Sequence, residues 1–255
     1  MRIFIDLVCM IFAVFVMCSG CARHSSKMAE NTKTSASNLT IDPKVKTGKL
    51  PNGFRYVIRP NGKPENRSEL RLVVDVGSVL EDENQQGLAH FVEHMAFNGT
   101  ENFHKQELVD YLELVGMRFG PDLNAYTSFD ETVYMLQIPM DSTIVIDTAM
   151  QILLDWAQGI KFDSEEIDKE RGVVVEEWRL GQGANRRMFD QQLPILLRGS
   201  RYAHRLPIGQ KAVLDTFSHE TLKTFYRTWY RPELMSFVAV GQFETSYMES
   251  LAIKY

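Results

Sequence analysis

The chain has 255 residues, of which 44% are hydrophobic and 24% charged, and its formal net charge is -5. This length and balance are those of an ordinary globular protein with one large domain or two small ones. The negative net charge offers no electrostatic basis for binding nucleic acid, so we expect no nucleic-acid partner.

The first 21 residues predict a secretory leader. Arg2 is followed by an uncharged apolar run, Leu7 to Met17, which is too short to span a bilayer comfortably. Ser19 and Gly20 directly precede Cys21, an order that resembles a bacterial lipoprotein signal, in which the cysteine becomes the lipidated N-terminus. We therefore expect an exported protein of the bacterial periplasm or outer membrane, attached to a membrane through lipid on Cys21. The alternative is a cleaved leader without lipid.

The segment after the leader, residues 22–45, is rich in Ser, Thr, Lys and Asn and has few large apolar side chains. It cannot bury enough surface to offset its ordering entropy, so we interpret it as a flexible tether. The folded domain is expected over residues 46–255. All three cysteines lie in the leader, which excludes a disulfide or a cysteine-zinc site within this domain.

Strands and helices of this domain can be predicted in chain order. Asn52-Gly53 predicts the turn of a hairpin, and Phe54 to Ile58 the strand that leaves it. Alternating apolar residues predict a half-buried strand from Leu70 to Val76. Helical spacing predicts a helix from Gln86 to Phe97, which Asn98-Gly99 ends.

The later part of the domain continues this mixture. Lys105 to Val115 is a predicted helix, and two strands, Ala125 to Phe129 and Thr132 to Ile138, flank a turn at Asp130-Glu131. Three further helices and a closing strand are predicted at Ser142–Ile160, Ser164–Arg179, Ser218–Tyr230 and Met235–Val240. The pattern indicates an α+β fold, with a mostly antiparallel or mixed sheet of about six strands and helices packed on one face.

Residues 90–94 read His-Phe-Val-Glu-His and lie in a predicted helix. His90 and His94 are four residues apart, so their rings project from one face and can bind one zinc ion. Glu93 flanks the same face, where a carboxylate can take a proton from a water molecule that zinc has made more acidic. The alternative interpretation is two surface histidines on an amphipathic helix.

A catalytic zinc ion needs a third protein ligand from elsewhere. Glu170 and Glu177 are seven residues apart in a predicted helix, two turns, so they face the same way, whereas Glu176 points elsewhere. Spacing alone offers Glu170 and Glu177 as a pair, of which one binds zinc and the other supports the site. The alternative is that both belong to a solvated helix face.

Together these segments resemble the insulinase, pitrilysin and mitochondrial-processing-peptidase family of zinc peptidases, whose His-x-x-Glu-His motif inverts the common zinc-protease order. The resemblance covers about residues 46–245. It is carried by Val76-Gly-Ser-Val-Leu-Glu81, Gly87-Leu-Ala-His-Phe-Val-Glu-His-Met-Ala-Phe-Asn-Gly-Thr100, Asn124-Ala-Tyr-Thr-Ser-Phe-Asp-Glu-Thr-Val-Tyr134, Glu170-Arg-Gly-Val-Val-Val-Glu-Glu-Trp-Arg179, Tyr230-Arg-Pro232 and Val238-Ala-Val-Gly241.

The resemblance implies a LuxS/metallopeptidase-like αβ domain with one Zn2+ ion on His90, His94 and Glu177. It implies that Glu93 is the general base and that Glu170 supports the site without binding metal. The gap between His94 and Glu177 is longer than in the best-known members, which leaves Glu176 as an alternative third ligand.

The resemblance also implies a way of binding substrate. In the family, a strand edge pairs with an unfolded or extended peptide, and the matching residues here are Asn124, Ala125, Tyr126 and Thr127. Their alternative role is ordinary sheet structure.

Family members have two related halves, each built from two domains of about this size, and this sequence matches only the first, N-terminal catalytic domain. Later domains are therefore expected to be absent from it, and a second half or a companion subunit to be its partner. The main hypothesis is a zinc-dependent endopeptidase. The alternatives are a truncated or split member that binds zinc but is inactive alone, and a non-catalytic partner subunit that binds peptides.

Overall fold

The computed structural model describes residues 40–114, 116 and 123–255. The predicted leader, its lipidation site Cys21 and most of the predicted tether lie outside these residues. The chain divides into two units, Met1–Asp42 and Pro43–Tyr255, and all described helices and strands belong to the second unit.

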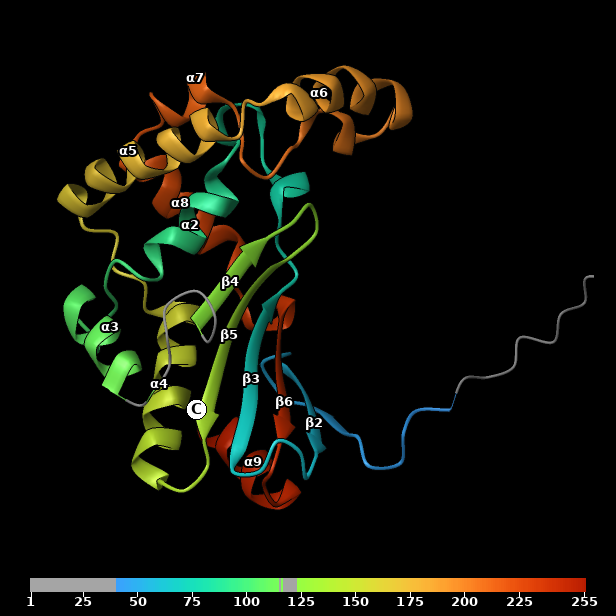
Figure 1. Ribbon diagram of the computed structural model, residues 1–255, viewed down its shortest axis with the longest axis vertical. Coiled ribbons are helices and arrows are strands. Elements are labelled where there is room, and N and C mark those ends of the chain that lie inside the picture. Colours follow the sequence, from blue (N-terminus) through green and yellow to red (C-terminus); the bar gives the residue numbers. More distant parts are fainter. Residues whose placement is uncertain (1–39, 115, 117–122) are drawn as a thin grey trace, which may run out of the picture. The chain divides into compact units, whose positions relative to one another are not determined.

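The second unit contains a six-stranded mixed sheet (Figure 1). Its strands are β1 (Lys46–Lys49), β2 (Arg55–Pro60), β3 (Arg67–Val74), β4 (Leu123–Thr127), β5 (Thr132–Pro139) and β6 (Met235–Gly241). Their order in space is β1-β2-β6-β3-β5-β4, where β2 and β6 are parallel and the other neighbours antiparallel. The prediction of a mixed sheet of about six strands is confirmed.

The first two strands form the hairpin that Asn52-Gly53 predicts. Gly53 donates its backbone N–H to the carbonyl of Leu50 at 2.9 Å, and Leu50 donates to the carbonyl of Phe54 at 2.8 Å. Gly53 has φ of 94°, a left-handed conformation that glycine adopts without a steric penalty.

Helices account for the rest of the fold. The α-helices are α2 (Leu88–Met95), α3 (Lys105–Leu114), α4 (Thr143–Gln158), α5 (Ser164–Leu180), α6 (Ala184–Leu196), α7 (Lys211–Leu214), α8 (His219–Trp229) and α9 (Thr245–Lys254). Short 3-10 helices are η1 (Ser78–Leu80), η2 (Glu83–Gln85), η3 (Arg201–His204) and η4 (Pro232–Leu234). None of the described helices has the length and apolarity needed to cross a membrane.

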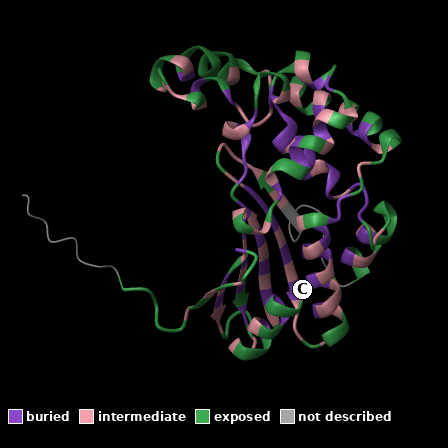
Figure 2. Cartoon of the chain, turned by 180° about the vertical axis from the view of Figure 1, so that it is seen from behind, coloured by how far each residue is buried: buried purple, intermediate pink, exposed green. Residues whose placement is uncertain are grey.

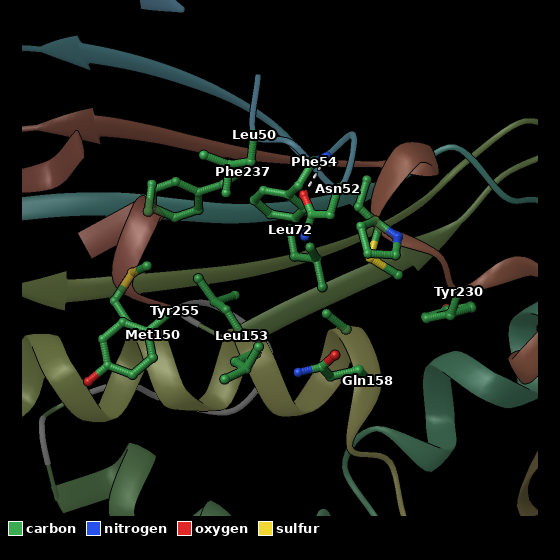
Figure 3. Close-up of a pocket in the computed structure, with 15 residues that line it drawn as sticks. Leu50, Asn52, Phe54, Leu72, Met150, Leu153, Gln158, Tyr230, Phe237 and Tyr255 are labelled. Carbon is green, nitrogen blue, oxygen red and sulfur yellow. Dashed lines mark hydrogen bonds between the residues drawn. The ribbon is translucent and has the colours of Figure 1, made fainter. Parts of the chain in front are cut away.

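The main core lies between the sheet and α4. Along β3, buried and half-buried residues alternate, and Leu70 and Leu72 are at most 2% exposed. Figure 3 shows Leu72 facing Met150 and Leu153 of α4 across a hollow of about 190 Å³. Figure 2 shows this interior in purple. None of the residues that line the hollow is a candidate metal ligand, so we interpret it as part of the core.

The structure differs from the sequence prediction at several boundaries. The strand predicted at Ala125–Phe129 ends at Thr127, because the turn is wider than Asp130-Glu131: Ser128 donates its N–H to the carbonyl of Glu131 at 2.7 Å. The first predicted helix is two residues shorter at each end. The sequence prediction left α6 unassigned, and its exposed surface explains why: Met188, Ile195 and other apolar side chains are exposed rather than packed in a core. Figure 2 shows α6 mostly in green, the colour of exposed residues.

Candidate metal centre

Helix α2, which carries the His-x-x-Glu-His motif, begins at a carboxylate. The side chain of Glu81 is fully buried and accepts the backbone N–H groups of Gly87 at 2.9 Å and Ala89 at 2.8 Å. These donors have no partner within the helix, so the side-chain oxygens of Glu81 supply the acceptors that the first turn of α2 lacks. Gly87 has φ of 104° and allows the sharp entry into the helix. Glu81 therefore fixes where α2 starts and which way its side chains point.

One side of α2 is buried in the core and the other faces α5. Leu88, Phe91 and Val92 are fully buried, whereas the side chains of His90 and His94 are 13% and 21% exposed. Figure 1 shows α2 and α5 as neighbours. The two imidazole rings, one turn apart, lie edge to face with their centres 4.6 Å apart.

Three candidate ligand atoms converge between these helices. Nε2 of His90 and Nε2 of His94 are 3.3 Å apart, and Oε2 of Glu177 lies 3.7 Å from the first and 3.5 Å from the second. His90, His94 and Glu177 form the one group of three or more His, Cys, Asp or Glu residues in the described chain that can hold a metal ion together.

The spacing of these atoms fits a tetrahedral ion. Ligands at the usual zinc distances of about 2.0–2.1 Å lie about 3.3 Å from one another at the corners of a tetrahedron. The observed separations of 3.3, 3.5 and 3.7 Å are close to this value. Two imidazole nitrogens and one carboxylate oxygen are also a donor set that zinc accepts in catalytic sites with an open fourth position.

A second carboxylate orients one of the histidines. Nδ1 of His94 lies 2.7 Å from Oε1 of Glu170, and Asn98 donates its side-chain amide to Oε2 of the same carboxylate at 2.8 Å. In the neutral ring, a proton on Nδ1 bonded to Glu170 leaves the lone pair of Nε2 free for a metal. Nδ1 of His90 is buried and has no hydrogen-bond partner among the described residues.

Burial and neighbouring charges shift the pKa values of the two histidines in opposite directions. Burial alone would disfavour a charged His94, but its contacts with Glu170 and Glu177 outweigh burial and raise its pKa to about 9. Burial, helped by the charge of His94, lowers the pKa of His90 to about 4. The raised pKa of His94 favours its charged form, and a metal ion at Nε2 would compete with the proton on that nitrogen.

Glu93 lies on the same helix but has a separate environment. Its residue surface is 8% exposed, and Oε2 accepts the hydroxyl of Thr127 at 2.6 Å. Burial raises the pKa of the Glu93 carboxyl, and the hydrogen bond from Thr127 partly opposes this. A raised pKa brings a carboxylate closer to the value that suits proton transfer at neutral pH.

The four predicted substrate-binding residues all belong to β4, which pairs with β5 and lies at one end of the strand order. Along β4, backbone pairing joins Asn124 to Met135 and Thr127 to Thr132. Tyr126 is 39% exposed and donates its hydroxyl to Glu131, while Ala125 is half-buried. Since α2 packs against β4, the end of the sheet and the metal cluster are neighbours.

The structure separates the three glutamates of α5. Glu170 and Glu177 both reach the histidines of α2, as the two-turn spacing predicts. Glu176 forms a salt bridge with Arg179 and lies outside the cluster. Sequence reasoning gave Asn98 only the role of ending the helix, and did not anticipate its bond to Glu170 or the bond between Thr127 and Glu93. Asn98 follows His94 by four residues, about one turn, which could have indicated that the two lie near one another.

This fold, with its paired histidines on α2 and the glutamate on α5, is an αβ domain with a candidate metal site of the inverted-motif zinc peptidase type. Residues 56–197 match the insulinase family, peptidase family M16, and residues 216–255 match the peptidase M16 inactive domain. The chain belongs to the peptidase M16 family.

Several relatives of this chain are named zinc proteases. The probable zinc protease PqqL of Escherichia coli is 40% identical over 218 residues, which are 86% of this chain and 23% of that protein. The zinc protease PQQL-like of Arabidopsis thaliana is 44% identical over 77% of this chain and 20% of its own length. The chain thus spans between a fifth and a quarter of these relatives.

Solved structures agree with this placement. The crystal structure of the periplasmic protease PqqL from Escherichia coli matches with a TM-score of 0.81 and 39% identity, over 85% of this chain and 24% of that one. A structure of the first half of the same protease matches over 46% of its length. The described fold is therefore that of the N-terminal part of a peptidase M16 protease.

Proposed function

We propose that this chain is the zinc-binding catalytic domain of an endopeptidase that cleaves extended peptides. The observation that carries the proposal is the convergence of the His90, His94 and Glu177 ligand atoms at 3.3–3.7 Å from one another. These three residues would hold one zinc ion, which supplies a Lewis acid that polarises a carbonyl and lowers the pKa of a water molecule.

Glu93 is the base in this proposal. Its carboxylate takes a proton from the water whose oxygen attacks the peptide carbonyl carbon, and later gives that proton to the amine nitrogen as the C–N bond breaks. Glu170 acts through His94, because it holds the ring in the tautomer that presents Nε2. Glu177 is the third ligand in this proposal rather than Glu176, because Glu176 forms a salt bridge with Arg179.

The backbone of β4 is the expected substrate-binding element. An extended peptide can add as a further strand to the edge of β4 that pairs with no other strand among the described residues, beside Asn124, Ala125, Tyr126 and Thr127. Such recognition uses main-chain hydrogen bonds. It therefore selects peptides for an unfolded or extended conformation rather than for particular side chains.

We also propose that a second half or companion subunit completes the site. The side chain of Glu177 is 51% exposed, so water reaches the cluster from one side in this chain. Peptidases exclude water when their site closes, and the relatives are four to five times longer than the matched region. The same exposure favours a second candidate function. In it, this chain binds zinc and peptide but cleaves nothing until the second half or companion subunit covers the site.

For localisation, we propose export to the bacterial periplasm with lipid attached at Cys21. Support comes from the leader sequence and from the periplasmic relative PqqL. Labelling cells with a radioactive fatty acid should mark the wild-type chain and leave Cys21→Ser unmarked. Label on both chains, or on neither, would reject the anchor.

The enzymatic proposal is tested with the zinc-loaded chain and unfolded casein, alone and with the remaining part of Escherichia coli PqqL added as a separate polypeptide. Wild type should cleave in at least one condition, and Glu93→Gln should bind an equal amount of zinc but cleave at least about 1000-fold more slowly. Cleavage only with the added polypeptide supports the companion. Equal zinc with no cleavage in either condition supports the peptide-binding alternative.

A further inference from the structure

The hydroxyl group of Thr127 connects the substrate strand to the proposed base. Thr127 is the last residue of β4, and its Oγ1 donates to Oε2 of Glu93 on α2 at 2.6 Å, across 34 residues of sequence. An O–H···O bond of this length to a carboxylate is in the range of charge-assisted hydrogen bonds, which are about twice as strong as neutral ones.

A second threonine is the alternative acceptor for the Thr127 hydroxyl. Thr132 lies opposite Thr127 in the register of β4 and β5, and its fully buried Oγ1 donates to the carbonyl of Val76 at 2.9 Å. The two threonine oxygens are 3.4 Å apart. Because a hydroxyl has one proton and that of Thr132 is used on Val76, Thr132 can only accept from Thr127. The carboxylate is the closer and charged acceptor, so the Thr127 proton goes to Glu93.

We propose that Thr127 is a positioning residue: its hydroxyl holds Oε2 of Glu93 and leaves Oε1 as the oxygen that takes and returns the proton. This rests on the proposed function, since the choice of oxygen matters only if Glu93 is the base. The proton lost by water forms an O–H bond at Oε1, and that bond breaks when the proton moves to the amine nitrogen.

The arrangement places two tasks on one strand. The backbone of β4 offers the edge along which a peptide would lie, while the side chain of its last residue fixes the base. The distance between the bound peptide and the proton acceptor is therefore set by a direct contact between β4 and α2, both regular elements, and does not depend on a loop. In this proposal Thr127 acts through Glu93, and its side chain does not contact the substrate.

A double-mutant cycle on thermal unfolding of the full chain tests the contact without relying on activity. Thr127→Val keeps the side-chain shape and removes the hydroxyl, and Glu93→Ala removes its acceptor. Thr127→Val should lower Tm by about 3 °C more when Glu93 is present than when residue 93 is alanine. Equal Tm losses in the two backgrounds would overturn the proposal.

Thr100→Val is the matched control for this cycle. Thr100 is buried and its hydroxyl donates to Oδ2 of Asp155 at the same distance, 2.6 Å, outside the metal cluster. Thr100→Val should lower Tm by the same amount in the wild-type and in the Glu93→Ala background. Thr127→Ser keeps a hydroxyl, so it should retain most of the stabilising interaction with Glu93 that Thr127→Val removes.

Kinetics in the condition where wild type cleaves casein supply the second measurement. Thr127→Val should lower kcat about 10- to 100-fold with KM and zinc content unchanged, and Thr127→Ser should restore most of kcat. A rise in KM alone would show instead that Thr127 contacts substrate and would overturn the positioning role. If wild type cleaves nothing, the proposed function fails, and the Tm cycle still decides whether Thr127 holds Glu93.

Discussion

His94 on α2 and Glu170 on α5 are joined by a 2.7 Å contact between Nδ1 and Oε1. This contact does two things at once: it ties together the two helices that supply the three candidate ligands, and it selects the ring nitrogen that faces His90 and Glu177. Asn98 holds the other oxygen of the same carboxylate.

Removing the negative charge of Glu170 should weaken zinc binding without removing a ligand. In Glu170→Gln the amide is a poorer acceptor for Nδ1–H of His94, so Nε2 becomes less basic. We expect zinc affinity to fall about 10- to 100-fold, measured by competition with a chromophoric chelator. The control is Glu176→Gln, which disturbs only the exposed pair with Arg179. Unchanged affinity in Glu170→Gln would show that the contact does not tune the ligand.

Glu177 and Glu176 are adjacent in sequence, and the structure assigns them different surroundings. Glu177→Ala should lower zinc affinity by on the order of 100-fold or more, because two histidines alone form an incomplete catalytic site. Glu176→Ala should bind zinc as the wild type does. The opposite result, loss of zinc in Glu176→Ala only, would identify Glu176 as the third ligand.

Removing the metal should destabilise the domain. Zinc at about 100 times its Kd stabilises a folded state by about 2.7 kcal/mol, which corresponds to roughly 5–10 °C in Tm for a domain of this size. Addition of a chelator should lower Tm by that amount in the wild type and have no effect in His90→Ala. His219→Ala, which removes a histidine paired with Asp168 on the surface of α5 and α8, should keep the full zinc effect.

Stability should also depend on the protonation of Glu81. Burial raises the pKa of Glu81 from its usual value of 4.5 to about 8, and the backbone N–H donors of Gly87 and Ala89 and the charge of Arg205 partly oppose this rise. The folded state therefore binds the proton more tightly than the unfolded state. The stabilisation from this proton is fully present below pH 4.5 and is lost as the pH rises through 8, at up to about 1.4 kcal/mol per pH unit.

Comparison with Glu81→Gln isolates this effect. The free energy of unfolding of wild type minus that of the variant, from urea titrations, should decrease between pH 5 and pH 8 and level off above it. The variant itself loses one backbone acceptor at the start of α2, so it should be less stable than wild type at pH 5. A difference that does not change with pH would show that Glu81 has the same pKa in both states.

Much of the candidate site follows from the sequence alone, because it depends on local geometry. Four residues make about one helical turn, so a helix containing His90 and His94 brings their rings together, and seven residues make two turns, so Glu170 and Glu177 share a face. The same reasoning gave the hairpin at Asn52-Gly53 and the mixed sheet of about six strands. None of these inferences needed to know which elements are neighbours.

Tertiary packing decides those features of the site that local geometry does not. Spacing left Glu170 and Glu177 as interchangeable partners of the histidines, and only the position of α5 against α2 brings Glu170 to Nδ1 of His94 and Glu177 to the Nε2 atoms. The bond from Thr127 to Glu93 joins a strand to a helix 34 residues away, and no local pattern encodes it. Such contacts depend on the relative placement of whole elements, which is fixed by how the complete core packs.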